Sequence, residues 1–141
     1  MKYIKYFIQF ILTIFSFILF KFLGPKVSSN VTGKIFEKVG PFFRSKNIIH
    51  SNIKNAFPNI DNKNLNQITK KMWNNYGRVF AEYIFIKDFR IGKLSSKIEI
   101  NGQEILNEMI NHNKQAVFVS GHLGNFELMA MHLEKAGIKL S

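Results

Sequence analysis

A segment of seven residues at positions 121–127 (GHLGNFE) contains the residue types that proton-transfer chemistry requires. His122 and Glu127 are five positions apart, about 140° around one continuous helix, so they cannot meet on the same helix. They can meet if His122 lies in a turn and Glu127 in the first turn of the next helix. The carboxylate would then hold the imidazole in one tautomer, and the imidazole would take a proton from a hydroxyl attacking an ester or thioester.

The other polar and small residues of this segment suit substrate binding. Gly121 and Gly124 permit a tight turn and close approach of the backbone to a substrate. Asn125 can cap the following helix, whose first N–H groups are unpaired and able to support an anion or oxyanion. We therefore expect His122 and Glu127 to be catalytic, and Gly121, Gly124 and Asn125 to bind substrate. A purely structural role for Glu127, complementing the positive end of the helix dipole, stays open.

Several other kinds of site find no support in the sequence. There is no cysteine, which excludes a thiolate nucleophile, an iron–sulfur cluster and a Cys-ligated zinc site. HExxH, P-loop and GxGxxG motifs are absent, so neither a metal nor an organic cofactor is indicated. The remaining histidines stand in polar contexts, and His132 is expected on a helix surface.

The segments around this motif alternate in character. Residues 97–101 and 116–120 have the pattern of strands, residues 102–113 and 125–136 that of helices, and residues 138–140 resemble the start of another strand. Strand, helix, strand, helix, strand predicts a parallel α/β domain, in which catalytic residues follow the carboxyl ends of strands. Upstream, apolar spacing predicts helices over residues 27–39 and 45–57, and a long helix beginning at Asp61 or Asn62.

Residues 3–23 are almost entirely apolar, and a helix of that length spans about 31 Å, close to the hydrocarbon thickness of a bilayer. An uncleaved membrane anchor is the favoured interpretation. A cleaved signal peptide is disfavoured because Gly24-Pro25-Lys26 is a poor cleavage site, and a buried helix because no polar face exists. The slight excess of lysine after the segment favours a cytoplasmic body. We expect residues 1–24 to be the anchor, 25–96 a helical segment and 97–141 the start of the α/β domain.

Composition limits the class of protein and its partners. The chain has 141 residues, 46% hydrophobic and 21% charged, which suits one globular domain with an attached apolar segment. Lys plus Arg number 20 against 9 Asp plus Glu, giving a formal charge of +11. This surplus favours nucleic acid, anionic lipid or an acidic carrier protein. The basic residues are mostly lysine, which weakens the nucleic-acid interpretation because base and phosphate readout prefers arginine.

An ordered set of motifs gives the chain a resemblance to the lipid A biosynthesis late acyltransferases of the lauroyl/myristoyl type. Residues 52–58 (NIKNAFP) resemble the family's NLxxAFP stretch, and residues 72–78 (MWNNYGR) its WxNxGR helix. Residues 100–104 (INGQE) resemble its vxGxE segment, and residues 121–127 its GHxGNWE motif, with Phe126 in place of Trp. The wider glycerolipid acyltransferase superfamily is similar in its His-x4-Asp/Glu motif.

The resemblance implies an enzyme that moves an acyl chain from an acyl carrier protein thioester to a hydroxyl of an anionic lipid A precursor. It implies His122 as general base, Glu127 as its partner, and a location at the bacterial inner membrane. The family's later blocks, including an arginine motif for acceptor phosphate, lie beyond residue 141, so the resemblance covers its N-terminal half. An inactive truncated or split fragment, completed by a second polypeptide, therefore stays open as the alternative.

Overall fold

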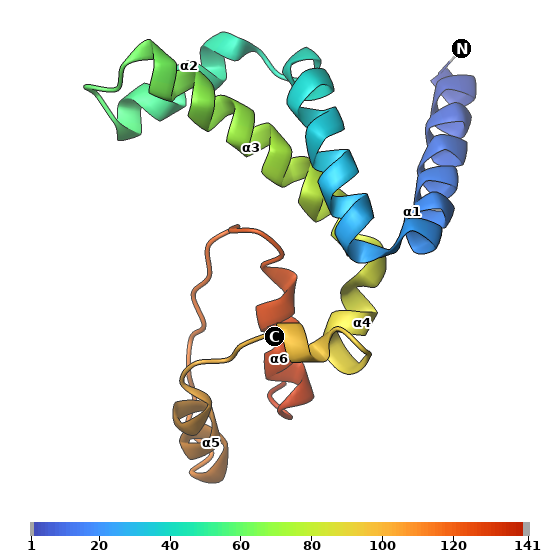
Figure 1. Ribbon diagram of the computed structural model, residues 1–141. Coiled ribbons are helices and arrows are strands. Elements are labelled where there is room, and N and C mark those ends of the chain that lie inside the picture. Colours follow the sequence, from blue (N-terminus) through green and yellow to red (C-terminus); the bar gives the residue numbers. More distant parts are fainter. Residues whose placement is uncertain (1, 140–141) are drawn as a thin grey trace. The chain divides into compact units, whose positions relative to one another are not determined.

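The structure, a computed structural model, describes residues 2–139 (Figure 1). Contacts divide the chain into two compact units that meet between Ile84 and Phe85, and each unit is considered by itself. The first unit contains α1 (Lys2–Val39), the 3-10 turn η1 (Gly40–Phe42), α2 (Lys46–Ala56) and α3 (Asn62–Glu82). The 3-10 turn η2 (Tyr83–Phe85) passes into the second unit, which continues with α4 (Ile86–Ile91), η3 (Ser95–Lys97), α5 (Gln103–Asn111) and α6 (Glu127–Lys135).

Helix α1 bends sharply at Gly24, so that its first arm leaves α3 while its second segment runs along α3 (Figure 1). Gly24 has φ 75° and ψ 167°, a conformation that only glycine adopts readily, and Pro25 then removes a backbone donor. The hydroxyl of Ser28, which is fully buried, donates to the carbonyl of Phe20 at 3.0 Å across the bend. The bend is therefore built into the sequence and its polar groups are satisfied locally.

The second segment of α1 and helix α3 pack at very short range because small residues line their crossing. A Cβ on Gly77 would lie 2.4 Å from the carbonyl oxygen of Thr32, so only glycine lets the two backbones approach this closely. The indole of Trp73 covers Gly40 in the same way, since a Cβ there would lie 2.2 Å from the ring. Trp73 and Gly77 belong to the segment that resembles the family's WxNxGR helix, and this packing gives them a structural role.

Phe80 of α3 lies at the centre of an aromatic cluster that joins both parts of α1. Its ring is stacked on Phe36 with centroids 5.8 Å apart, and meets Phe20 edge-on at 6.0 Å and Phe17 at 5.8 Å. Phe17 and Phe20 precede the Gly24 bend and Phe36 follows it. The cluster therefore fixes the end of the first arm against α3, while the residues before it remain exposed.

Several expected helices are confirmed. The long helix begins at Asn62, where the Asp61 carboxylate accepts the backbone N–H of Asn64 at 2.8 Å as an N-cap. Helices α2, α5 and α6 fall within the ranges 45–57, 102–113 and 125–136 that apolar spacing predicts.

The expected α/β fold class is wrong: residues 2–139 form helices, turns and loops, and contain no strand. Residue 97 ends the turn η3, residues 98–100 are irregular, and residues 116–120 lie in a loop where Val117 and Val119 are 91% and 89% exposed. The third expected strand, residues 138–140, is irregular at 138 and 139 and otherwise outside the described residues. Alternating apolar residues specify which face a strand would bury, but a strand also needs a neighbour for its backbone hydrogen bonds, and none lies beside these segments in the described part.

Candidate active site

The predicted site residues lie in the second unit, between the loop of residues 114–120 and the start of α6. Gly124 has φ +60°, and no atom lies within 4 Å of the place a Cβ would occupy, so the turn needs glycine for its backbone conformation rather than for space. Glu127 is the first residue of α6. His122 therefore lies in the irregular segment that precedes α6, and Glu127 lies in the first turn of that helix.

The imidazole of His122 packs against the ring of Phe126, with centroids 4.0 Å apart and planes inclined at 54°. Phe126 is the N-cap of α6 and immediately precedes Glu127, so this contact holds His122 at the start of the helix. His122 is exposed, whereas Asn125, Phe126 and Glu127 are half-buried. An exposed imidazole on a half-buried aromatic ring is accessible to a substrate while its position is restrained.

Residues 121–126 lead from the loop into α6. The N–H of Leu123 donates to the carbonyl of Gly121 at 2.8 Å, and the carbonyl of Asn125 accepts the N–H of Leu128 at 3.1 Å. Asn125 thus contributes a backbone acceptor to the first turn of the helix. The negative charge of Glu127 lies at the N-terminal end of α6, where it complements the helix dipole.

A cleft of about 430 Å³ lies elsewhere in the second unit, between residues 98–103, α5 and α6. Its lining is mostly apolar, with His132 and Gln103 as a polar pair: the Nε2 atom of His132 and the Oε1 atom of Gln103 are 2.8 Å apart. Because an amide oxygen only accepts, Nε2 of His132 is the donor in this hydrogen bond. His132 is therefore half-buried and hydrogen-bonded, not a simple surface residue as expected, and His122 is not among the residues lining this cleft.

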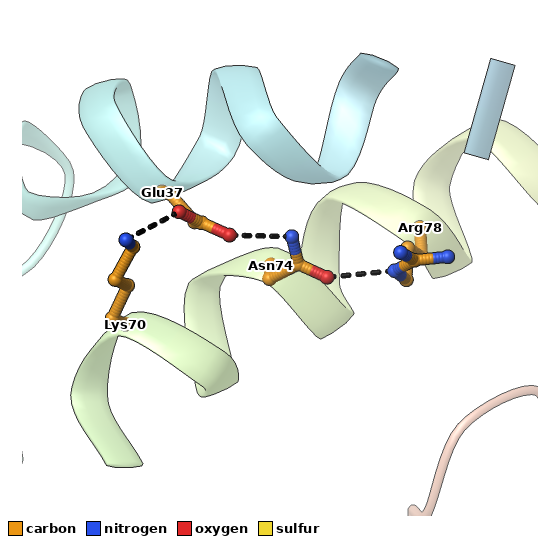
Figure 2. A network of polar contacts seen from close by, with 4 residues as sticks. All are labelled: Glu37, Lys70, Asn74 and Arg78. Atoms are coloured by element: carbon orange, nitrogen blue, oxygen red, sulfur yellow. Dashed lines mark hydrogen bonds and ion pairs between the residues drawn. The ribbon is translucent and has the colours of Figure 1, made fainter. Parts of the chain in front are cut away.

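The first unit contains a chain of polar contacts between α1 and α3 (Figure 2). The Glu37 carboxylate accepts from Asn74 Nδ2 at 2.7 Å and pairs with Lys70 Nζ at 3.2 Å. Asn74 Oδ1 in turn accepts from Arg78 Nε at 2.6 Å. Arg78 continues the chain to the hydroxyl of Ser29 at 3.4 Å.

Electrostatics keep Glu37 ionised within this network. Desolvation acts to raise the pKa of Glu37, but hydrogen bonds from Lys70 and Asn74 and the charges of Lys70 and Lys34 outweigh it and hold the pKa below its ordinary value. The ionised carboxylate then accepts charge-assisted hydrogen bonds that cross from α1 to α3. The network consequently stabilises the crossing of the two helices. No signal in the sequence alone could pair Glu37 with Asn74, because the partners lie 37 positions apart.

A family model for bacterial lipid A biosynthesis acyltransferases matches residues 1–141, the whole chain. The chain belongs to this family. Comparisons with curated proteins and with solved structures give no match. The suspected resemblance is thereby confirmed, and the protein is a member of a family of acyl-transferring enzymes of lipid A biosynthesis.

The two units of this lipid A biosynthesis acyltransferase differ in whether their polar side chains are accessible to a substrate. The polar residues of the first unit, Glu37, Asn74 and Arg78, are engaged with one another across a helix crossing. The second unit presents an exposed imidazole beside a helix N-terminus. Of the two, the segment 121–127 is the better candidate for acyl-transfer chemistry.

Proposed function

We propose that this chain acts in acyl transfer from an acyl carrier protein thioester to a hydroxyl of a lipid A precursor, with His122 as general base and Glu127 as its partner. The observation that carries the proposal is the exposed imidazole of His122, held on Phe126 directly before the helix that Glu127 begins. Family membership supports the acyl-transfer reaction class.

In the proposed reaction, a ring nitrogen of His122 takes the proton of the acceptor hydroxyl as its oxygen attacks the thioester carbonyl. A tetrahedral intermediate forms, its C–S bond breaks, and the carrier thiolate leaves with the proton from the imidazolium. The negative charge of Glu127 stabilises the imidazolium between these two steps. No side-chain nucleophile is needed, because the acceptor supplies the hydroxyl.

Gly121, Gly124 and Asn125 are proposed to bind substrate at this turn. The open space beside Gly124 leaves its backbone accessible. The first N–H groups of α6 point out of its N-terminal end, which follows Gly124 in the chain. Such donors can stabilise the oxyanion of the tetrahedral intermediate. The supporting observation is the local geometry of the turn together with the half-buried setting of Asn125.

We further propose that residues 1–24 anchor the protein in the bacterial inner membrane, with residues 25–96 as a helical support and residues 97–141 as the catalytic part, facing the cytoplasm. The helix Lys2–Phe42 is long and apolar enough to cross a bilayer, with a mean hydropathy of 2.0 over its most apolar window. Residues 2–15 of its first arm are exposed on all sides, as in Tyr3, Phe7 and Phe10. An exposed, uniformly apolar helix is suited to lipid. The anionic acceptor and an acidic carrier protein match the net charge of +11.

The alternative, a chain that is inactive until a second polypeptide completes it, is favoured by one observation. Val117 and Val119 precede the proposed site and are exposed at 91% and 89%, which is unusual for two neighbouring apolar side chains. A partner covering them would fix the loop that leads to His122. Activity that appears only when such a partner is co-expressed would support this form of the proposal.

The experiment supplies the full chain, in membranes of cells that express it, with a lipid A precursor and with either acyl carrier protein or coenzyme A as thiol of the donor. Product is identified by mass spectrometry. The proposal expects an acylated precursor, formed faster from the carrier-protein donor. Transfer at equal rates from both donors contradicts the donor assignment, and no transfer with either contradicts the proposed reaction.

A further inference from the structure

The turn that follows α1 exposes two large aromatic side chains side by side in the sequence. Phe42 is 88% exposed and Phe43 is 76% exposed. Arg44 and Lys46 follow directly and are exposed as well. We call these four residues the basic–aromatic turn.

The turn is firmly held, so its exposed rings are not the consequence of a loose segment. The N–H of Phe43 donates to the carbonyl of Gly40 at 2.9 Å, and Gly40 is covered by the indole of Trp73. Pro41 further restricts the backbone between them. A buried tryptophan and a hydrogen-bonded turn thus hold the two phenylalanines in exposed positions.

Along the sequence, the charged side chains that flank the turn are positive. Between Glu37 and Asp61 the sequence contains no acidic residue but four basic ones: Lys38, Arg44, Lys46 and Lys54. All four are exposed, and within residues 2–139 none forms an ion pair. The segment that carries the two rings therefore has basic side chains and no acidic ones, which makes it complementary to an anionic surface.

We propose that the basic–aromatic turn docks on an anionic lipid bilayer, with Phe42 and Phe43 entering the headgroup region and Arg44 and Lys46 on lipid phosphates. Aromatic rings beside basic residues are the combination that binds membrane interfaces, where the rings replace water and the cations attract acidic headgroups. An acidic protein would match the charges, but it would leave two protruding rings without a bilayer to enter. Lipid is therefore the occupant that uses both features.

This contact lies beyond the proposed function, because it needs neither the catalytic assignment of His122 nor a particular acyl donor. It would add a second point of attachment, separated in sequence from the apolar arm of α1 by the Gly24 bend. One anchor leaves a protein free to tilt over the membrane, whereas two points fix the orientation of the first unit. The apolar arm alone keeps the chain on vesicles, so the test must report on the turn itself.

The absence of native cysteine makes a site-specific probe possible. The full chain is reconstituted in vesicles as Phe43→Cys carrying an environment-sensitive fluorophore, and Asn75→Cys, an exposed polar position on α3, serves as the matched control. The vesicles contain phosphatidylcholine alone or mixed with phosphatidylglycerol, and in each case include lipid with a doxyl quencher on the acyl chain. Far-UV circular dichroism checks that each labelled chain keeps its helices, with Phe42→Cys as the substitute position if Phe43→Cys does not.

We expect the label at position 43 to be quenched in vesicles with phosphatidylglycerol, while the label at position 75 is not. Replacing Arg44 and Lys46 by glutamine weakens the partition of the turn by about fivefold for each charge removed. Replacing Lys63 and Lys71, two exposed lysines outside the turn, removes the same charge and leaves the quenching unchanged. A label at position 43 that reports water in both kinds of vesicle overturns the proposal. So does a label that responds only when an acidic carrier protein is added, since that result assigns the turn to the donor protein.

Discussion

Replacing Gly77 with alanine tests the close crossing of α1 and α3, and the structure determines the sign of the effect. At an unobstructed helix position this change stabilises by about 1 kcal/mol through helix propensity. Here the new Cβ would lie 2.4 Å from the Thr32 carbonyl oxygen and 2.8 Å from the Cβ of Phe36. Because one obstacle is backbone, the two helices must separate by about 1 Å to reach ordinary contact distance.

That separation loosens every contact across the crossing, including the stacking of Phe80 on Phe36. Overpacking of this kind costs about 1–3 kcal/mol, and a gap of 0.5–1 Å gives up a quarter to a half of each contact's dispersion energy. Because the nearest obstacle is backbone, we expect a cost in the upper part of this range, about 2–3 kcal/mol. After the propensity gain of about 1 kcal/mol is subtracted, Gly77→Ala should lower the free energy of unfolding by about 1–2 kcal/mol.

The assay is denaturant unfolding of the full chain in one detergent, followed by far-UV circular dichroism. Gly33→Ala is the matched control: Gly33 is also buried at this crossing, but its added Cβ would meet side-chain atoms of Asn74 and Arg78 at 3.0–3.1 Å, which can shift by a few tenths of an ångström. In the control, the propensity gain of about 1 kcal/mol offsets the cost of shifting these two side chains, so its free energy of unfolding should stay within about 0.5 kcal/mol of the unsubstituted chain. A Gly77→Ala chain as stable as the unsubstituted one, or more so, would refute the close crossing.

Three further changes test individual contacts within the first unit. Ser28→Ala leaves the Phe20 carbonyl without its buried donor and should destabilise the first unit by about 1–3 kcal/mol in the same unfolding assay; no loss would contradict the hydrogen bond across the bend. The pKa of Glu37 is lowered in the fold, so its contribution is present above the ordinary glutamate pKa and is lost as the pH falls through the lowered value. Thermal stability should accordingly decline on acidification, and less steeply in Glu37→Gln, whereas equal slopes would argue against the network. Phe80→Ala should cost about 3–5 kcal/mol by removing the centre of the aromatic cluster, and a loss below about 1 kcal/mol would contradict its central position.

The local parts of this fold could be predicted from the sequence, since they depend on neighbouring residues. The regular apolar spacing after Asp61 and the capping preference of aspartate predict α3 and its first residue. The interruption at Gly24-Pro25 indicates the end of one helical arm, although not the conformation that joins it to the next. In the same way, the apolar spacing over 125–136 predicts a helix after His122 with Glu127 in its first turn, and the observed helix begins two residues later than that range, at Glu127.

The parts that could not be predicted depend on residues far apart in the chain. The alternation at 97–101 and the apolar run at 116–120 both indicate strands. A strand also needs a neighbouring strand to pair with, and the residues of these two segments do not show whether one is present. The contact of His132 with Gln103, 29 positions away, places a residue expected on the surface inside a cleft. The motif of residues 72–78 contains Trp73, yet only the packing explains this residue, because its partner Gly40 lies on a different element.

The central claim is that His122 acts as the general base, and one comparison of rates tests it most directly. Acyl transfer from the carrier-protein donor to the lipid A precursor is measured for the unsubstituted chain, His122→Ala and His112→Ala. His112 lies just after α5, where its Nδ1 atom is bonded to the carbonyl of Glu108 at 2.9 Å, so its loss serves as the matched control. We expect a loss of about 10²–10⁴-fold in His122→Ala and a nearly unchanged rate in His112→Ala. A loss of about tenfold or less in His122→Ala, with the protein still folded, would contradict it.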